Sequence, residues 1–208
     1  MEDVLDVYKR PCDPSHPLVC FDERPKQLIG ERRVPISIAP GKPRRYDYEY
    51  RRNGVANVFM MFEPLAGKRH VKVTEHRTKK DWAYCIRELV DEVYPDADSI
   101  VLVMDNLNTH KKASLYEAYE PTEAKRIADK LEIHYTPKHG SWLNMAEIEI
   151  SVMARQCFAE RMDNIINLSS EVDAWAEKRN SKEANVDWRF TTDDARIKLK
   201  KLYPSIEL

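Results

Sequence analysis

The run SIVLVMD, residues Ser99–Asp105, decides the fold of this chain of 208 residues. Its apolar stretch, Ile100–Met104, leads without a break into an acid. A strand with one wet face alternates apolar and polar residues, so a short and wholly apolar run indicates a central strand buried on both faces. Such a strand needs helices on both sides of its sheet. The run therefore predicts an α/β domain, with Asp105 at the carboxyl end of a central strand.

The segments on either side predict the other strands. The apolar run in PLVCFDE predicts a short strand that ends at Asp22. Two β-rich runs, Val55–Glu63 and Arg69–Glu75, are joined by a Leu-Ala-Gly-Lys turn, which predicts an antiparallel hairpin. Further on, IHYTP predicts a last short strand closed by Pro137. Antiparallel strands followed by alternating helix and strand indicate a mixed α/β sheet with helices on its faces.

Helices are expected where apolar residues recur at helical spacing. The segment TKKDWAYCIRELVDEVY predicts one helix, with Thr78 as its N-cap and Pro95 as its stop. Short helices are expected in HKKASLYEAY and PTEAKRIADKLE. The remaining predicted helices run from Asn144 to about Arg161, from Leu168 to about Arg179, and from Thr192 to Tyr203.

Composition excludes a membrane or secreted protein. Hydrophobic residues make up 42% and charged residues 33% of the chain, which is the mix of an ordinary globular domain. No apolar run approaches the roughly 18 residues of a membrane helix, and MEDVLDVYKRPCDP carries acids where a signal peptide is basic. The four cysteines show no Cys-x-x-Cys pair, so reduced thiols are expected. We expect a cytoplasmic protein with no membrane partner.

Charge is unevenly distributed along the chain. The net charge is −1, which does not by itself indicate a nucleic-acid-binding protein. From Arg24 to Asn53, however, nine basic residues face three acidic ones, a local charge of +6, with proline, glycine and tyrosine between them. This pattern suits a surface that contacts a nucleic-acid backbone. A solvated hairpin with arginines lying along its surface is an equally good interpretation of the same pattern.

Two acids lie where an α/β sheet places its sites. Asp22 and Asp105 are expected at the carboxyl ends of two strands that should be neighbours, and sites in open α/β sheets form beyond those ends. Either aspartate could instead cap the following turn or helix. Clustered carboxylates repel unless a cation neutralises them, and hard oxygen ligands favour Mg²⁺ or Mn²⁺. Two such ions about 4 Å apart promote phosphodiester chemistry.

The stretch HGSWLNMAEIEI, residues His139–Ile150, offers two further acids, Glu147 and Glu149. Asn144 is a suitable N-cap, and Glu147 follows it by three positions, as in a capping box. Glu149 falls within the apolar face of the expected helix, whereas Glu147 falls outside that face. Periodicity singles out Glu149 as the oddly placed acid and leaves Glu147 with a capping role. Spacing alone does not choose between them.

Four motifs in order resemble one protein family. VCFDE, VMDNLNTHK and TPKHGSWLNMAEIE, followed by the tail from Trp175 to Pro204, together resemble the catalytic part of bacterial insertion-sequence transposases of the mariner superfamily. These belong to the DDE group of ribonuclease H-like polynucleotidyl transferases. The resemblance implies a mixed five-stranded sheet in which three antiparallel strands precede parallel ones. It also implies that Asp22, Asp105 and, through the Leu-Asn-x-x-Glu pattern, Glu147 are the metal ligands and catalytic acids.

The same resemblance implies the chemistry. The three acids would hold two Mg²⁺ ions, for which Mn²⁺ substitutes, with Asp22 bridging both. Water would first cut the DNA at the transposon end, and the released 3′-hydroxyl would then attack target DNA. Further residues are expected to position phosphate, water or DNA, although loop hydrogen bonding or packing would also account for them: Asn106, Asn108, His110, His139, Trp142, Arg44, Arg45, Arg51 and Arg52.

The resemblance also sets the expected organisation and partners. Residues 1–17 resemble a connector, 18–162 the catalytic domain, and 163–208 a helical extension of that domain. Complete relatives carry helix-turn-helix modules before the connector, so we expect a homodimer on DNA and a full-length or separate helix-turn-helix transposase subunit as a further partner. The expected location is the cytoplasm, at the bacterial nucleoid when bound to DNA. Two rival hypotheses are an idle DNA-binding or regulatory remnant and a stand-alone nuclease that recognises DNA structure.

Overall fold

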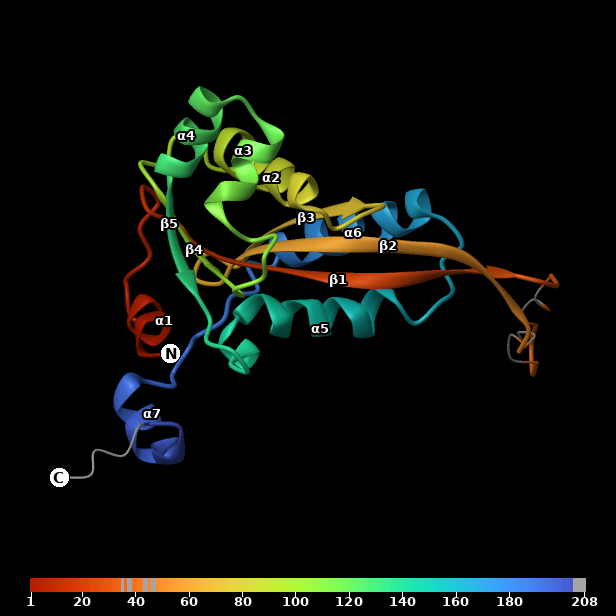
Figure 1. The fold of residues 1–208 in the computed structure, drawn as a ribbon. Coiled ribbons are helices and arrows are strands. Elements are labelled where there is room, and N and C mark those ends of the chain that lie inside the picture. The colour runs from red at the N-terminus through yellow and green to blue at the C-terminus, as the bar shows by residue number, and fades with distance from the viewer. Residues whose placement is uncertain (35, 37–38, 43–44, 46–47, 204–208) are drawn as a thin grey trace.

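The computed structural model describes residues 1–34, 36, 39–42, 45 and 48–203. Its centre is a five-stranded sheet with the order β3-β2-β1-β4-β5 (Figure 1). The pairs β1–β2 and β2–β3 are antiparallel, whereas β1–β4 and β4–β5 are parallel. This arrangement confirms the predicted mixed sheet. The strands are β1 (Leu18–Glu31), β2 (Tyr50–Glu63), β3 (Lys68–Thr74), β4 (Ile100–Met104) and β5 (Leu131–Tyr135).

Helices cover both faces of the sheet, as the buried β4 run requires. The α-helices are α1 (Glu2–Val7), α2 (Lys79–Glu88), α3 (Lys112–Ala118), α4 (Pro121–Asp129), α5 (Met145–Cys157), α6 (Ile165–Asn180) and α7 (Thr192–Lys198). A π-helical turn extends α2 over Leu89–Val93, and 3₁₀ turns occupy Ser141–Leu143 and Lys200–Leu202. The last helix is therefore shorter than expected, because its α-helical part ends at Lys198.

Local sequence signals explain where these helices begin. The Thr78 side chain accepts a hydrogen bond from the N–H of Asp81, whose carboxylate accepts from the N–H of Thr78, so a capping box starts α2 as predicted. Pro121 occupies the first turn of α4, where its missing N–H costs nothing. Asn144 caps α5 by accepting from the N–H of Ala146.

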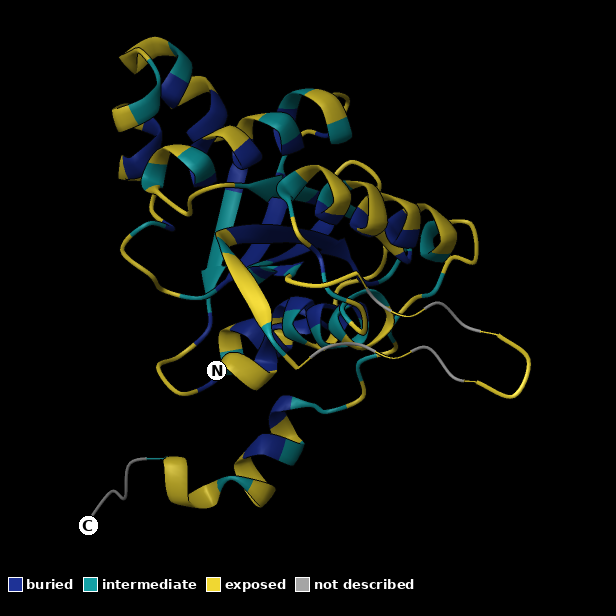
Figure 2. Cartoon of the chain, turned by 90° about the vertical axis from the view of Figure 1, so that its right-hand side faces the viewer, coloured by how far each residue is buried: buried dark blue, intermediate teal, exposed yellow. Residues whose placement is uncertain are grey.

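Alternation along β1 builds two cores. Cys20 belongs to a core that packs under α1, α5, α6 and α7, whereas Val19 and Phe21 belong to a second core under α2, α3 and α4. Figure 1 shows α2, α3 and α4 on one side of the sheet and α5 on the other, and Figure 2 shows the strands between them as the buried layer. Successive side chains of a strand point to opposite faces, so Asp22 continues on the α5 side and Glu23 on the α2 side.

The expectation that β1 ends at Asp22 is wrong. The strand parts from β4 after Cys20 but stays paired with β2, residue by residue, to the pair Glu31 and Tyr50. The paired strands form a long ribbon that extends beyond the helices (Figure 1). The Asp-Glu-Arg-Pro sequence suggested a strand end, but Pro25 is tolerated because β1 no longer pairs with β4 at that point.

Two composition-based expectations can be compared with the structure. All four cysteines are free, which confirms the expectation of reduced thiols. Within the part of the chain that the structure describes, no helix combines the length and the apolar character needed to cross a bilayer. The cytoplasmic location stays a prediction.

Candidate active site

The register of the parallel strands places Asp22 and Asp105 at the same level. The last parallel pair joins Cys20 of β1 to Val103 of β4, and each aspartate lies two residues beyond its member of that pair. Both aspartates are half-buried. The two side chains therefore lie on neighbouring strands at the carboxyl edge of β4, where sites form in sheets of this kind.

Asn144 ties the start of α5 to this edge. Its Oδ1 accepts from the N–H of Ala146 at 3.1 Å, and its Nδ2 donates to the carbonyl of Phe21, the residue before Asp22, at 2.8 Å. Asn144 is 1% exposed, so both bonds are shielded from water. Because Glu147 lies in the first turn of the helix that Asn144 caps, the Asn-x-x-Glu spacing carries its side chain to the β1 edge.

The capping role offered to Glu147 is only partly realised. Asn144 does cap the helix, but its own N–H donates to the carbonyl of Ser141 at 2.7 Å. The backbone N–H of Glu147 donates to the carbonyl of Asn144 at 3.0 Å. The N–H that a capping box would give to the Glu147 carboxylate is thus used elsewhere, and the capping explanation for Glu147 weakens.

Asp22 interacts electrostatically with both other acids. Burial is the main cause that raises the pKa of Asp22 to about 7, and the neighbouring charges of Glu23, Asp105 and Glu147 raise it further. A hydrogen bond from the N–H of Glu23 to Asp22 Oδ1, at 2.8 Å, opposes the shift. The three predicted acids therefore belong to one electrostatic site. Among the residues that the structure describes, no three His, Cys, Asp or Glu side chains already enclose a common metal position.

Glu149 belongs to a different structure. It is 1% exposed, and its Oε1 lies 2.7 Å from Arg69 Nε and 2.5 Å from Arg179 Nε. Arg69 comes from β3 and Arg179 from α6, so Glu149 joins three elements through buried ion pairs. The oddly placed acid of the helical pattern is thus explained by two arginines that are distant in sequence.

His110 is the most deeply enclosed of the predicted positioning residues. Its side chain is 1% exposed, with Nδ1 at 2.5 Å from Asp105 Oδ1 and Nε2 at 3.1 Å from Glu23 Oε2. Burial disfavours the charged imidazole, but the hydrogen bonds to Asp105 and Glu23 outweigh it and raise the pKa of His110 to about 9. Sequence reasoning missed Glu23, although its place beside Asp22 in VCFDE was a usable signal.

The other predicted loop residues lie around Asp105. Asn106 and His139 are exposed and line a surface pocket with Asp105, and His139 adopts the left-handed φ of 64° that few non-glycine residues accept. Asn108 is exposed in the same loop as Asn106. Trp142 is 42% exposed and packs on two aromatic rings of the tail, stacking on Trp188 at 6.4 Å and meeting Phe190 edge-on at 5.7 Å.

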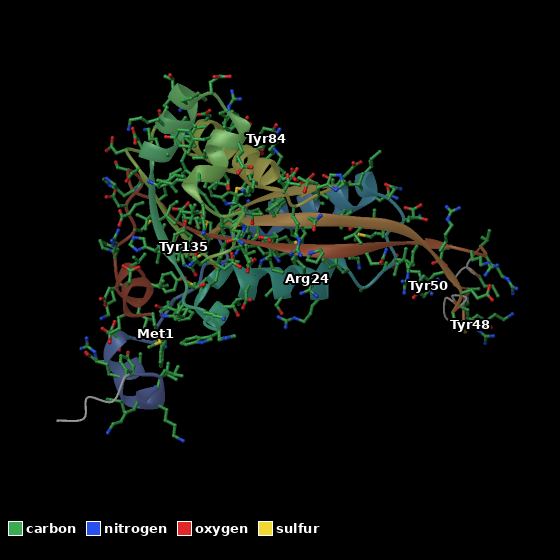
Figure 3. All side chains as sticks on the ribbon, in the orientation of Figure 1. Met1, Arg24, Tyr48, Tyr50, Tyr84 and Tyr135 are labelled. Carbon is green, nitrogen blue, oxygen red and sulfur yellow. The ribbon has the colours of Figure 1, made fainter. Side chains whose placement is uncertain are left out.

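The predicted arginines lie on the β1–β2 ribbon. Arg45, Arg51 and Arg52 are exposed, and Arg51 Nε donates to Asn53 Oδ1 at 3.0 Å, while Arg44 lies outside the described residues. Figure 3 shows Tyr50, the neighbour of Arg51, toward the far end of the ribbon and Arg24 beside the helical body. The structure therefore does not bring these arginines to the three acids; it places them on an extension of the strand that carries Asp22.

The sheet and the three acids on its edge define a ribonuclease H-like catalytic fold. A family model described as a DDE superfamily endonuclease matches residues 17–169, which include all three acids. The chain belongs to this family. No curated protein sequence matches the chain.

Solved structures share the fold at low sequence identity. The Mos1 mariner paired-end complex with Mn matches at 14% identity and a TM-score of 0.55, over 87% of this chain and 55% of that chain. The Mos1 transposase paired-end complex with left transposon end matches at 14% and 0.56, again over 87% and 55%. A pre-cleavage Mos1 transpososome matches at 13% and 0.54, over 89% and 60%. The chain thus spans between 55% and 60% of the length of these proteins.

Proposed function

We propose that this chain is the catalytic domain of a DDE transposase, which cuts DNA at insertion-sequence ends and joins the cut strand to target DNA. One observation carries the proposal: Asp22, Asp105 and Glu147 come from three separate elements and act on one another at a single sheet edge. A half-buried carboxylate beside two others is costly for a fold that uses it only structurally. The Phe21–Asn144 bond, which holds α5 against β1 at this edge, is consistent with a built site.

The donor set fits a hard divalent cation. Asp22, Asp105 and Glu147 offer carboxylate oxygens alone, which are the ligands that Mg²⁺ and Mn²⁺ prefer over thiolate or imidazole. We assign these three residues as the ligands, with room for two ions. When bound, such ions would activate the attacking water or hydroxyl and stabilise the leaving oxygen. Family membership supports a divalent metal, as does the similar Mos1 complex that is described as containing Mn.

The protein's own groups account for substrate binding. The β1–β2 ribbon presents Arg45, Arg51 and Arg52 to solvent, and it continues directly from the strand that carries Asp22. We assign it to the DNA backbone, whose phosphates would counter the charge of the basic segment. The similar Mos1 structures are described as paired-end complexes, which supports DNA ends as substrate and two copies of the chain acting together. A helix-turn-helix partner stays a prediction.

A cleavage and joining assay tests this function. The protein is incubated with supercoiled plasmid and with pre-cut transposon ends in Mg²⁺ or Mn²⁺. We expect nicking and joining that are abolished by Asp22→Ala, Asp105→Ala and Glu147→Ala. Glu177→Ala, which removes an exposed glutamate of α6, is the matched control and should leave both products unchanged. Urea unfolding of each variant separates loss of the site from loss of the fold.

Each rival hypothesis predicts a different product pattern. Nicks without any joined product would favour a plain nuclease that recognises DNA structure. DNA binding without cleavage, under conditions where a full-length relative cuts, would favour an idle regulatory remnant. Products that survive all three alanine substitutions would refute the assigned site.

A further inference from the structure

His110 connects two of the motifs that surround the site. Its ring lies between two carboxylates, with Nδ1 at 2.5 Å from Asp105 Oδ1 and Nε2 at 3.1 Å from Glu23 Oε2. Glu23 follows Asp22 on β1 but points to the opposite face, toward α2 and α3. The three side chains thus link the DE pair of the first motif to the aspartate of the second, across the strands that carry both aspartates.

The position of the ring is fixed on every side. It meets Phe21 edge-on at a centroid distance of 5.5 Å and Trp82 at 6.1 Å. Tyr135 donates its hydroxyl to the His110 carbonyl at 2.8 Å, and the His110 N–H donates to the carbonyl of Leu107 at 3.1 Å. An imidazole packed in this way cannot swing away, so the direction of its Nδ1–H is set before any ligand arrives.

Glu23 has no evident structural reason to be buried. Its side chain is 4% exposed, and Oε2 has no well-aligned hydrogen bond although it lies 3.1 Å from His110 Nε2. The other oxygen, Oε1, lies 3.7 Å from Arg77 Nη1, too far for a hydrogen bond. Enclosing a carboxylate with so few partners costs stability. Support of a metal ligand explains the cost, because groups behind a ligand fix its orientation and the tautomer of the histidine between them.

We propose that His110 and Glu23 are positioning residues for Asp105: Glu23 orients the imidazole, and His110 holds one oxygen of Asp105 so that the other faces the metal. The inference rests on the proposed function, since it needs Asp105 to be a ligand. It assigns to Glu23 and His110 a role that differs from contact with phosphate or DNA. Asp105 follows β4 in a loop and is half-exposed, so without this hold its carboxylate would sample several directions.

The test measures Mn²⁺ affinity directly, by the loss of the free Mn²⁺ electron paramagnetic resonance signal on titration with protein. His110→Ala is expected to weaken binding about 10- to 100-fold, the usual cost of removing such a partner. His110→Asn should recover much of the affinity, because its amide nitrogen can take the place of Nδ1. Glu23→Gln, which keeps the shape but weakens the acceptor, should show an intermediate loss.

His134→Ala is the matched control. His134 also lies between two carboxylates, with Nδ1 at 2.8 Å from Asp3 and Nε2 at 2.9 Å from Glu132, but it contacts neither Asp22 nor Asp105. We expect its loss to leave Mn²⁺ affinity unchanged. Urea unfolding without metal shows which variants are folded, and if His110→Ala is not, His110→Asn and Glu23→Gln decide the question.

The outcomes separate the two proposals. If Asp105→Ala abolishes Mn²⁺ binding while His110→Ala and Glu23→Gln bind like the unmodified protein, the positioning role is overturned and the metal site stands. If the unmodified protein binds no Mn²⁺, or Asp105→Ala binds it equally well, both proposals are overturned. Loss of affinity in His110→Ala with recovery in His110→Asn supports the positioning role, since a purely structural defect would not follow the donor nitrogen.

Discussion

Replacing Asp22 by Asn should stabilise the metal-free protein at alkaline pH. Burial and the nearby Asp105 and Glu147 raise the pKa of Asp22 to about 7 from its ordinary value of 3.8. A carboxyl with a raised pKa in the folded state costs nothing below the unfolded pKa, where it is protonated in both states. Its cost appears as pH rises from about 4 to 7 and is complete above 7. Asn has nearly the same shape and never ionises.

The magnitude follows from the size of the shift. A difference of about three pKa units corresponds to roughly 4 kcal/mol at 1.36 kcal/mol per unit, which is an upper value because water and local relaxation reduce it. We therefore expect Asp22→Asn to raise the free energy of unfolding by about 1–4 kcal/mol at pH 8 and by nothing near pH 3.5. A gain of this size marks a residue whose position serves function at the expense of stability.

Urea unfolding in the presence of a chelator, from pH 3.5 to 8, measures the effect. The matched control is Asp96→Asn, an exposed aspartate after α2, whose effect should stay within about 0.5 kcal/mol throughout. Adding Mg²⁺ should stabilise the unmodified protein and narrow the gap, because the ion binds the folded carboxylate. Equal stability of Asp22→Asn and the unmodified protein at pH 8 would refute the electrostatic reasoning.

Three further predictions test the fold and the proposed DNA surface. Glu149→Ala should lower the free energy of unfolding by about 3–5 kcal/mol, because it leaves Arg69 buried without its partner; an effect under 1 kcal/mol by urea unfolding would contradict the ion-pair explanation. Thr78→Ala should cost about 1 kcal/mol through the lost cap of α2, and an unchanged unfolding midpoint would count against that cap. Replacing Arg51 and Arg52 by Ala should reduce the salt dependence of DNA binding by about one log unit per lost phosphate contact, and an unchanged slope in fluorescence anisotropy would remove the ribbon from the DNA surface.

Much of the fold could be predicted because short local patterns determine it. The apolar run before Asp105 required helices on both faces, and the hairpin and the Thr78 cap are local signals. The length of β1 was not predictable from its own residues, because polar residues and Pro25 break the strand pattern. Pairing with β2, a segment about 30 residues away, keeps that part of the strand extended.

The candidate site divides in the same way. Asp105 follows from its strand, but Glu147 and Glu149 could not be separated by periodicity, which reports burial and not the reason for it. The reason is tertiary: Arg69 and Arg179 converge on Glu149 from β3 and α6. The tie between Asn144 and the carbonyl of Phe21, which directs the start of α5 to the β1 edge, is equally invisible in either segment alone.

The central claim is that Asp22, Asp105 and Glu147 together hold the divalent metal. Crystals grown or soaked with Mn²⁺, and measured near the manganese absorption edge, locate that metal by its anomalous signal. We predict anomalous peaks within bonding distance of oxygens from all three residues, and their loss in Glu147→Ala. Manganese bound at Glu149 or at another part of the surface, with these three carboxylates making no contact to it, would contradict the claim.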